Sequence, residues 1–293
     1  MAIRLIALDL DGTLLNSRGE LTPGNRAAIR EARARGVRVA LVTGRRFRDV
    51  RPLALDLGLD DVPVISHNGA LTKHARTLET VKAILLPLKA ARAVLRLGRE
   101  HNLDAMVSDD PGGLGVMLYD HINEENQALA KYIAWSRRIH GDEAATAIRR
   151  VPSLLEFLDH PPIHVGFSGS YETMARFGEE LQKALGQSIK AFATMTLYPK
   201  QNFGLIDVLH PEVSKGAGVA AAAEEFGIGR EEVMAVGDNF NDLEMLRYAG
   251  TPVIMRNAEA ALHEAGGFHV TASNDEDGVA VAIEKFILRE TAL

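Results

Sequence analysis

Two aspartates, Asp9 and Asp11, stand one residue apart at the end of an apolar N-terminal run and are followed directly by Gly12. Neighbouring carboxylates repel each other, and the apolar strand that leads to them strengthens the repulsion by partial desolvation, so the pair needs a cation or a proton. The spacing approaches that of an EF-hand calcium loop, but Leu14 stands where that loop needs glycine, and the element before it reads as a strand. The glycine after Asp11 instead indicates a sharp exit from a strand.

Two motifs further along the chain could receive an anion. Thr43–Arg45 offers a hydroxyl, a flexible glycine and a cation, although a lone threonine in such a place is more often a helix N-cap. Lys215 falls in the first turn of a predicted helix, where the helix dipole disfavours a cation. A nearby anion would remove that conflict, whereas a solvated lysine behind a Ser214 cap would leave the neighbouring glycines unexplained.

A fourth motif, Gly237–Asp242, adds the carboxylates of Asp238 and Asp242. Either acid could simply favour the start of the helix that follows. Together with the other three motifs, however, they supply three or four carboxylates, a hydroxyl and one or two cations. Phosphoryl transfer suits this inventory, because a carboxylate can attack phosphorus, Mg²⁺ prefers oxygen ligands, and lysine balances the charge of phosphoryl oxygens.

The elements that position these motifs alternate between strand and helix. Apolar runs predict the strands, and cap signals such as Pro23 at a first helical position predict helix starts. We expect strands over residues 2–10, 37–44, 62–70, 203–209, 231–237, 251–255 and 268–272, with helices over 22–36, 214–227 and 241–250 among them. This alternation predicts an α/β fold with a doubly wound, Rossmann-like parallel sheet. The four motifs then lie at the carboxyl ends of four strands, where open sheets bind ligands.

A second region interrupts this pattern. From about residue 85 to residue 196 the chain has longer helices, a turn-rich DDPGGLG stretch and isolated strands. We therefore expect residues 1–84 and 197–293 to form the core, with residues 85–196 as an inserted α/β domain.

The composition excludes several classes of function. The 293 residues carry a formal net charge of −6, with 33 basic and 39 acidic residues mixed along the chain, so no basic tract could line a nucleic-acid backbone. There are no cysteines, which excludes disulfides and thiolate chemistry and favours the cytoplasm. No uncharged stretch reaches the about 18 residues of a membrane helix. We expect a chain that binds neither nucleic acid nor membrane and is a monomer or homodimer.

The order and spacing of DLDGT at 9–13, TGR at 43–45, SKG at 214–216 and GDNFND at 237–242 resemble the haloacid dehalogenase superfamily of phosphatases. SHNGA at 66–70, the long insertion, and NDEDGVAVAIEKFIL at 274–288 are similar to its Cof-type branch. The resemblance spans essentially the whole chain.

This resemblance implies roles for the motif residues. Asp9 would be the nucleophile that forms an aspartyl-phosphate, and Asp11 would protonate the leaving alkoxide and then deprotonate the attacking water. Thr43 and Lys215 match the phosphate-binding hydroxyl and lysine. The implied cofactor is Mg²⁺. Its protein ligands would be the Asp9 carboxylate, the Asp11 backbone carbonyl and Asp238, and water and substrate phosphate would complete the set. Asp242 would support these ligands without binding the metal itself.

Further positions match less specific parts of the family pattern. The candidate substrate contacts are Gly12, Gly44, Arg45, Asn68 and Asn241. The chain departs from many relatives at Asp207, where they carry glutamate eight residues before the motif lysine. The insertion would be the family's cap, which selects the leaving group.

The implied function is a Mg²⁺-dependent phosphatase for small phosphomonoesters, such as sugar phosphates or other phosphorylated metabolites. A phosphomutase would use the same aspartyl-phosphate chemistry, and the sequence barely separates the two. A phospho-accepting receiver module also combines acids, a hydroxyl and a lysine, but its acceptor follows the third strand instead of the first. A non-catalytic phospho-ligand-binding protein would have no need for both Asp9 and Asp11.

Overall fold

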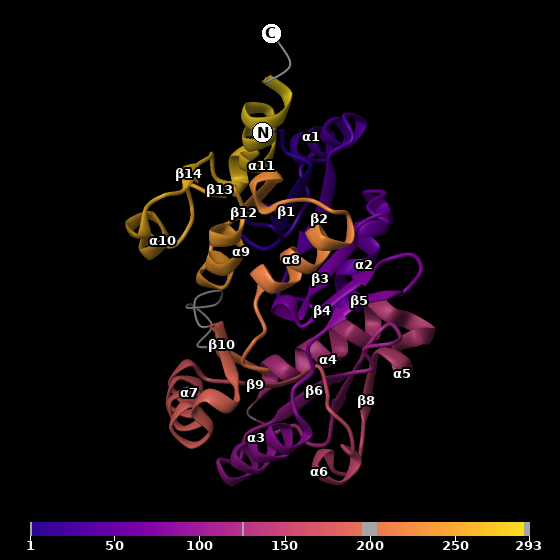
Figure 1. Cartoon of the computed structure of the whole chain (residues 1–293). Helices are drawn as coiled ribbons and strands as arrows, with labels where there is room; N and C mark the ends of the chain where they lie inside the picture. The colour runs from indigo at the N-terminus through magenta and orange to yellow at the C-terminus, as the bar shows by residue number, and fades with distance from the viewer. Residues whose placement is uncertain (1, 125, 195–203, 290–293) are drawn as a thin grey trace. The chain divides into compact units, whose positions relative to one another are not determined.

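The computed structural model describes residues 2–124, 126–194 and 204–289 (Figure 1). The chain divides into two compact units, Met1–Lys82 with Ser214–Leu293, and Ala83–Val213. The second unit is thus inserted, in sequence, between the two halves of the first. Within the described residues, no helix combines the length and apolar character needed to cross a membrane.

The first unit is built on an eight-stranded sheet in the order β14-β13-β12-β1-β2-β3-β4-β5. The pairs from β14 to β3 are parallel, and β4 runs antiparallel to β3. This arrangement confirms the predicted doubly wound α/β core. Its strands are β1 Leu5–Asp9, β2 Arg38–Val42, β3 Pro63–Ser66, β4 Leu71–His74, β5 Thr80–Ala83, β12 Val233–Gly237, β13 Thr251–Ile254 and β14 His269–Val270.

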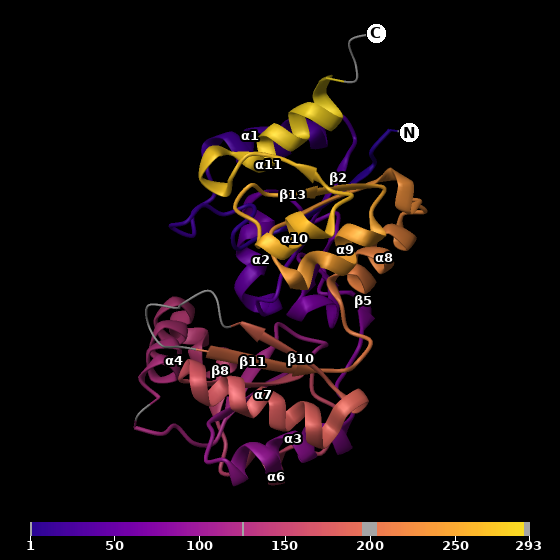
Figure 2. The ribbon, with the colours of Figure 1, turned by 90° about the vertical axis from the view of Figure 1, so that its left-hand side faces the viewer.

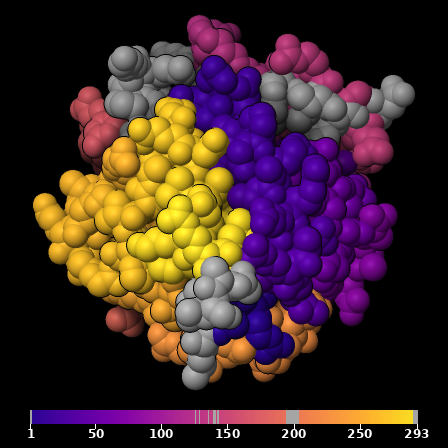
Figure 3. Space-filling model, turned by 90° about the horizontal axis from the view of Figure 1, so that it is seen from above, coloured from indigo at the N-terminus to yellow at the C-terminus, as the bar shows by residue number. Residues whose placement is uncertain are grey.

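Helices cover both faces of this sheet, with α1 and α11 on one face and α8 and α9 on the other (Figure 2). All five residues of β1 are therefore buried, as their continuous apolar run predicts. The surface view shows the C-terminal residues lying beside the N-terminal ones (Figure 3). The helices are α1 Pro23–Ala34, α2 Phe47–Asp56, α8 Lys215–Glu225, α9 Leu243–Tyr248, α10 Ala260–Ala265 and α11 Gly278–Ile283.

The start of α1 follows its sequence signals. The Thr22 side chain accepts a hydrogen bond from the Asn25 backbone N–H, and Pro23 takes the first helical position. Gly36, just beyond the helix, has a φ of +82°, which suits glycine at a helix end.

The second unit has a six-stranded sheet in the order β10-β11-β9-β6-β7-β8, antiparallel except for the β7–β8 pair. Phe177 of α7 packs edge-on against Phe167 of β9 on one face, with ring centroids 4.8 Å apart. Leu129 of α4 packs in a separate apolar cluster with Met106 of β6. The elements are β6 Ala105–Asp109, β7 Val116–Tyr119, β8 Ile148–Arg150, β9 His164–Gly169, β10 Lys190–Thr194, β11 Gly204–Leu209, α3 Leu88–Glu100, α4 Gln127–His140, α5 Ala144–Ala147, α6 Leu154–Phe157 and α7 Tyr171–Leu185.

One expected strand of the core lies in the other unit. Residues 204–209 of the run expected at 203–209 form β11, which pairs antiparallel with β9 and β10, so the described chain returns to the first unit only at Ser214. The expected boundary between residues 196 and 197 itself falls outside the described residues. The composition of a short apolar strand indicates that it is buried but does not indicate which sheet buries it.

Asp207, the position that departs from the family pattern, is therefore part of the second unit. Its Oδ1 lies 3.5 Å from Nε2 of His164, and burial raises the pKa of Asp207 to about 7. An aspartate with a raised pKa in the folded state binds a proton on folding, so its contribution to stability is present at low pH and is lost as the pH rises to about 7.

We predict that Asp207→Asn, which is neutral at every pH, raises the midpoint of thermal unfolding relative to the wild type more at pH 8 than at pH 5. The measurement is the difference in midpoint between the two proteins at each pH, because other groups affect both proteins equally. Asp61→Asn, at an exposed carboxylate paired with Arg33, is the matched control. A difference that does not depend on pH would contradict the raised pKa.

Candidate active site

The predicted nucleophile, Asp9, is the last residue of β1 and is buried. The chain then turns sharply, with backbone hydrogen bonds from Leu14 N–H to Asp9 O and from Leu15 N–H to Leu10 O. Gly12 makes this turn at a φ of +84°. A Cβ at this position would lie 2.3 Å from a carboxylate oxygen of Asp238. Only glycine thus lets the loop pass this close to the second acidic motif.

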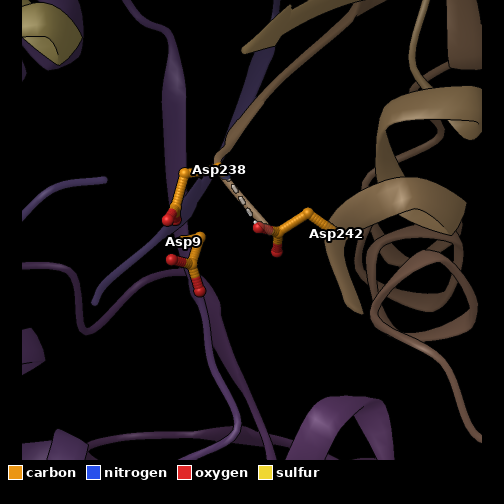
Figure 4. A group of neighbouring side chains, drawn as sticks. All are labelled: Asp9, Asp238 and Asp242. Atoms are coloured by element: carbon orange, nitrogen blue, oxygen red, sulfur yellow. Dashed lines mark hydrogen bonds between the residues drawn. The ribbon is translucent and has the colours of Figure 1, made fainter. Parts of the chain in front are cut away.

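Three carboxylates meet at the carboxyl ends of two neighbouring strands (Figure 4). Asp9 ends β1, Asp238 directly follows β12, and Asp242 lies in the short 3₁₀ turn Phe240–Asp242. One oxygen from each of these acids lies within 4.8 Å of the others. The parallel pairing of β1 with β12 brings together motifs that are more than 220 residues apart.

Lys215 is the counter-ion of this group. It begins α8 behind the Ser214 cap, is almost fully buried, and its Nζ donates hydrogen bonds of 2.6 Å to Oδ1 of Asp9 and to Oδ1 of Asp242. Burial alone would lower the pKa of Lys215, but the two carboxylates more than offset it and hold the pKa above its ordinary value. The cation that the helix dipole disfavours is thus stabilised by anions.

The group still carries an excess of negative charge. Burial raises the pKa of Asp9, with the carboxylates of Asp242 and Asp238 adding to the effect and Lys215 opposing it. Burial and then Asp242 raise the pKa of Asp238 to about 7. One lysine among three acids leaves room for a further cation or proton, the same requirement that the sequence posed for Asp9 and Asp11.

Asp9 and Asp238 are better candidates than Asp242 to bind a cation directly. Both oxygens of Asp242 are engaged, Oδ1 by Lys215 and Oδ2 by the backbone N–H groups of Asp238 and Asn239 at 2.9 and 3.0 Å. Asp238 uses Oδ1 to accept a 2.8 Å hydrogen bond from the Thr13 hydroxyl. An all-oxygen donor set of this kind fits a hard divalent cation such as Mg²⁺.

Asp11 points to a different partner. Its carboxylate is paired with Arg45, which donates from Nε to Oδ2 at 2.8 Å and from Nη2 to Oδ1 at 2.5 Å. The two side chains are 40% and 38% exposed, so the pair can separate into solvent without the cost of a buried ion pair. The predicted acid–base residue and a predicted substrate contact therefore bind each other in this structure.

The remaining predicted contacts lie on two loops that are joined to each other. Thr43 is buried after β2, and its backbone carbonyl accepts from the Asn68 N–H at 3.0 Å. Asn68 Oδ1 accepts from Nδ2 of Asn241 at 3.0 Å and would lie 3.2 Å from a Cβ at Gly44. Arg46, and not Thr43, is the N-cap of α2, so the capping explanation for Thr43 is wrong.

Close packing explains the SHNGA motif. His67, Asn68 and Gly69 all have positive φ values, of 52°, 56° and 98°. A Cβ at Gly69 would lie 1.9 Å from the Ser214 carbonyl oxygen, so the glycine lets this loop sit against the start of α8. The loop therefore helps to place Lys215.

Two features of the site differ from expectation. Three motifs follow strands of the core sheet, but Lys215 follows β11 of the second unit and reaches the site from the start of α8. The Thr13 contact to Asp238 and the hydrogen bond from Asn257 Nδ2 to the Gly12 carbonyl were not predicted. In the sequence, Thr13 could have been found from its position directly after the turn glycine. Asn257 could have been found from its position just after an expected strand.

Comparison with known proteins identifies the family. A family model described as haloacid dehalogenase-like hydrolase matches residues 6–283. The chain belongs to the haloacid dehalogenase-like hydrolases. This confirms the resemblance that the motifs indicate, including its Cof-type branch, and the expected enzyme class of hydrolase.

Similar proteins of this family cover nearly the whole chain. The 5-amino-6-(5-phospho-D-ribitylamino)uracil phosphatase YcsE of Bacillus subtilis (strain 168) is 30% identical over 98% of this chain and 96% of its own length. The pyridoxal phosphate phosphatase YbhA of Escherichia coli (strain K12) is 29% identical over 98% of this chain and 100% of its own length. The crystal structure of a haloacid dehalogenase-like hydrolase from Bacteroides thetaiotaomicron matches with a TM-score of 0.78 at 28% identity, over 97% of this chain and 99% of that one.

Proposed function

We propose that this hydrolase is a Mg²⁺-dependent phosphatase that releases phosphate from small phosphorylated metabolites through an aspartyl-phosphate on Asp9. The observation that carries the proposal is the group of buried Asp9, Lys215 and Asp242 with half-buried Asp238, which has one lysine among three acids. The similar proteins named above are phosphatases for two different small phosphorylated compounds, which supports the class of substrate but selects neither compound.

The metal would be held by the carboxylates of Asp9 and Asp238 together with the backbone carbonyl of Asp11. When bound, Mg²⁺ would neutralise charge on the acids and on the phosphoryl oxygens. Asp242 would not bind the metal directly, because both of its oxygens are already engaged by Lys215 and by backbone N–H groups. We therefore propose that Asp242 orients Asp238 and Lys215.

The chemistry proposed for the chain has two steps. A carboxylate oxygen of Asp9 forms a bond to phosphorus while the bond from phosphorus to the ester oxygen breaks, and Asp11 gives its proton to the leaving alkoxide. Asp11 then takes a proton from a water molecule that attacks the same phosphorus, and the bond to Asp9 breaks. Inorganic phosphate leaves, and both aspartates return to their starting states.

We assign Arg45 a role in this cycle because of its contacts with Asp11. Asp11 must be free of its bidentate pair with Arg45 before it can reach a leaving group. A dianionic phosphate would compete with the Asp11 carboxylate for the guanidinium, since both present the paired oxygens that arginine binds. Thr43 and Lys215 would bind the remaining phosphoryl oxygens.

The unit formed by Ala83–Val213 has a sheet and an apolar core of its own. We propose that it is the part of the chain that selects the leaving group, as in the capped members that the sequence resembles. Under this proposal, the residues that select the substrate are separate from those that break the phosphorus–oxygen bond.

The test is phosphate release from a panel of phosphomonoesters that includes sugar phosphates, pyridoxal phosphate, nucleotides and p-nitrophenyl phosphate. We expect release in the presence of Mg²⁺ and its loss on addition of EDTA, with recovery when excess Mg²⁺ is restored. A phosphomutase would instead convert one sugar phosphate into its isomer with little free phosphate. Absence of both activities would contradict a catalytic role.

A second prediction concerns Asp11→Asn. The asparagine keeps the shape of the side chain but cannot give or take the proton, so esters with poor alkoxide leaving groups should slow by about 10²-fold to 10⁴-fold. The first step with p-nitrophenyl phosphate should slow much less, because its leaving group scarcely needs a proton. The measurement is kcat for an alkyl phosphate and for p-nitrophenyl phosphate, with single-turnover release of p-nitrophenol to isolate the first step. Equal slowing of both first steps would exclude acid catalysis by Asp11.

A further inference from the structure

Two asparagines outside the predicted site join the loop after Asp9 to the C-terminal part of the chain. Nδ2 of Asn257 donates to the Gly12 carbonyl at 2.8 Å, and its Oδ1 accepts from the Asn274 N–H at 2.9 Å. Nδ2 of Asn274, which is buried, donates in turn to the Leu15 carbonyl at 3.0 Å. The two amides thus fix two carbonyls of the loop that carries Asp11.

The segment that contains Asn257 is also bonded to the other acidic motif. Met255 N–H donates to the Gly237 carbonyl, and Glu259 N–H donates to the Asp238 carbonyl at 2.9 Å. Asn257 therefore lies on a short backbone segment that is hydrogen-bonded on both sides to the end of β12. The Asn257 side chain links this segment to the turn at the end of β1.

The carbonyl that Asn257 holds is next to the metal-binding groups of the proposal. Gly12 follows Asp11 in sequence, and a Cβ on Gly12 would lie 2.3 Å from an Asp238 oxygen. The peptide that begins at the Gly12 carbonyl leads to Thr13, whose hydroxyl donates to Oδ1 of Asp238. The positions of Gly12 and Thr13 thus determine how far the Asp9–Asp11 loop lies from the Asp238 carboxylate.

Further contacts hold the loop that follows Asp9 along its length and explain the NDEDGVA part of the C-terminal motif. Ser17 N–H donates to Oδ1 of Asp275 at 2.8 Å, and the Thr22 hydroxyl donates to Asp277. The C-terminal motif therefore supports this loop at several points, and Asn257, which lies outside the motif, holds the loop at Gly12, directly after Asp11.

We infer that Asn257, oriented by Asn274, is a positioning residue that sets the separation of the two acidic loops and thereby the affinity of the site for a divalent cation. The inference rests on the proposed metal-dependent function. It requires no contact between Asn257 and the cation. Residues that orient metal ligands from outside typically change metal affinity by about 10-fold to 100-fold when they are removed.

The experiment is a titration of metal-free protein with Mn²⁺, in which free Mn²⁺ is counted by electron paramagnetic resonance, so that the readout does not depend on turnover. Asn257→Ala removes both side-chain hydrogen bonds, and Asn257→Asp keeps the acceptor for Asn274 but loses the donor to Gly12. We expect the dissociation constant for Mn²⁺ to rise by about 10-fold in Asn257→Ala. Arg256→Ala is the matched control, because the Arg256 side chain forms an exposed ion pair with Glu276 and its removal should leave the constant unchanged.

The outcomes separate the inference from the proposed function. If wild-type protein binds no Mn²⁺, the metal-dependent function and the inference both fall. If the wild type binds and Asn257→Ala binds equally well, only the inference is overturned, even where the unfolding midpoint drops. If Asn257→Ala does not fold, Asn257→Asp decides, because weakened binding in a folded Asp variant supports positioning and an equal constant overturns it.

Discussion

Asp9→Asn is expected to reduce phosphate release by about 10⁴-fold to 10⁶-fold, the loss typical of removing a nucleophile. The amide has nearly the same volume as the carboxylate, and its oxygen can still accept the hydrogen bond from Lys215 that Asp9 Oδ1 accepts now. An amide cannot form the bond to phosphorus that the first step requires. The effect should therefore fall on turnover and leave the fold intact.

The structure also predicts the effect of Asp9→Asn on stability. Because burial raises the pKa of Asp9, its ionised form is costly in the fold, and the neutral amide removes part of that cost. The unfolding midpoint of metal-free Asp9→Asn at pH 8 should be equal to or above that of the wild type. Steady-state kinetics, thermal unfolding and mass spectrometry of acid-quenched protein give the three readouts. Asp61→Asn serves as the control for an acid-to-amide change at an exposed position.

A wild-type rate in Asp9→Asn would exclude Asp9 as the nucleophile. The mass of quenched wild-type protein should increase by one phosphoryl group during turnover, and the variant should show no such increase. Loss of activity together with loss of the folded baseline in circular dichroism would count against the structural part of the prediction, because the change in volume is too small to disturb packing.

Much of the site was predictable because parallel strands have a direction. Asp9, Thr43 and Asp238 each follow an apolar run, and parallel strands place such residues at one edge of the sheet. The pairing of β1 with both β2 and β12 brings these residues together as expected. Lys215 was predictable from a conflict in its own sequence, a cation at a helix start, which the carboxylates of the site resolve.

The parts that were not predictable depend on non-local partners. Val208 of β11 is buried just as a strand of the core would be, yet β11 pairs with β9 and β10 because hydrogen-bond partners are decided by the whole sheet. An asparagine such as Asn257 gives no periodic signal, and its bond to Gly12 exists only because two loops from distant parts of the chain meet. The bidentate pair of Arg45 with Asp11 likewise depends on side-chain directions beyond two strand ends.

The second large effect is expected from Lys215→Met, which removes the counter-ion but retains most of the side-chain volume. Breaking a buried ion pair by removing one partner costs about 3–5 kcal/mol, because the remaining charges stay buried without compensation. Lys215 compensates two acids at once, Asp9 and Asp242, with both contacts at 2.6 Å. We expect a lower unfolding midpoint and loss of phosphate release.

The loss of stability in Lys215→Met should depend on both pH and metal. The pKa of Asp9 is already raised by burial and would rise further without the lysine that opposes this effect, so the acid is protonated at low pH and the deficit is small there. As the pH rises through the folded-state pKa, the proton is lost and the deficit grows, so the difference from wild type should be larger at pH 8 than at pH 5. Mg²⁺ should restore part of the midpoint at pH 8, because a ligand of the folded state stabilises it.

The control for Lys215→Met is Lys82→Met, which removes an exposed lysine of the same unit and should change neither midpoint nor turnover. A midpoint deficit in Lys215→Met that is the same at both pH values and is unaffected by Mg²⁺ would mean that the cost is one of packing and not of charge. Retention of turnover would remove Lys215 from the phosphate-binding role, leaving it only as a structural partner of Asp9 and Asp242. The pH dependence and the turnover therefore test separately the two tasks that one buried lysine is proposed to perform.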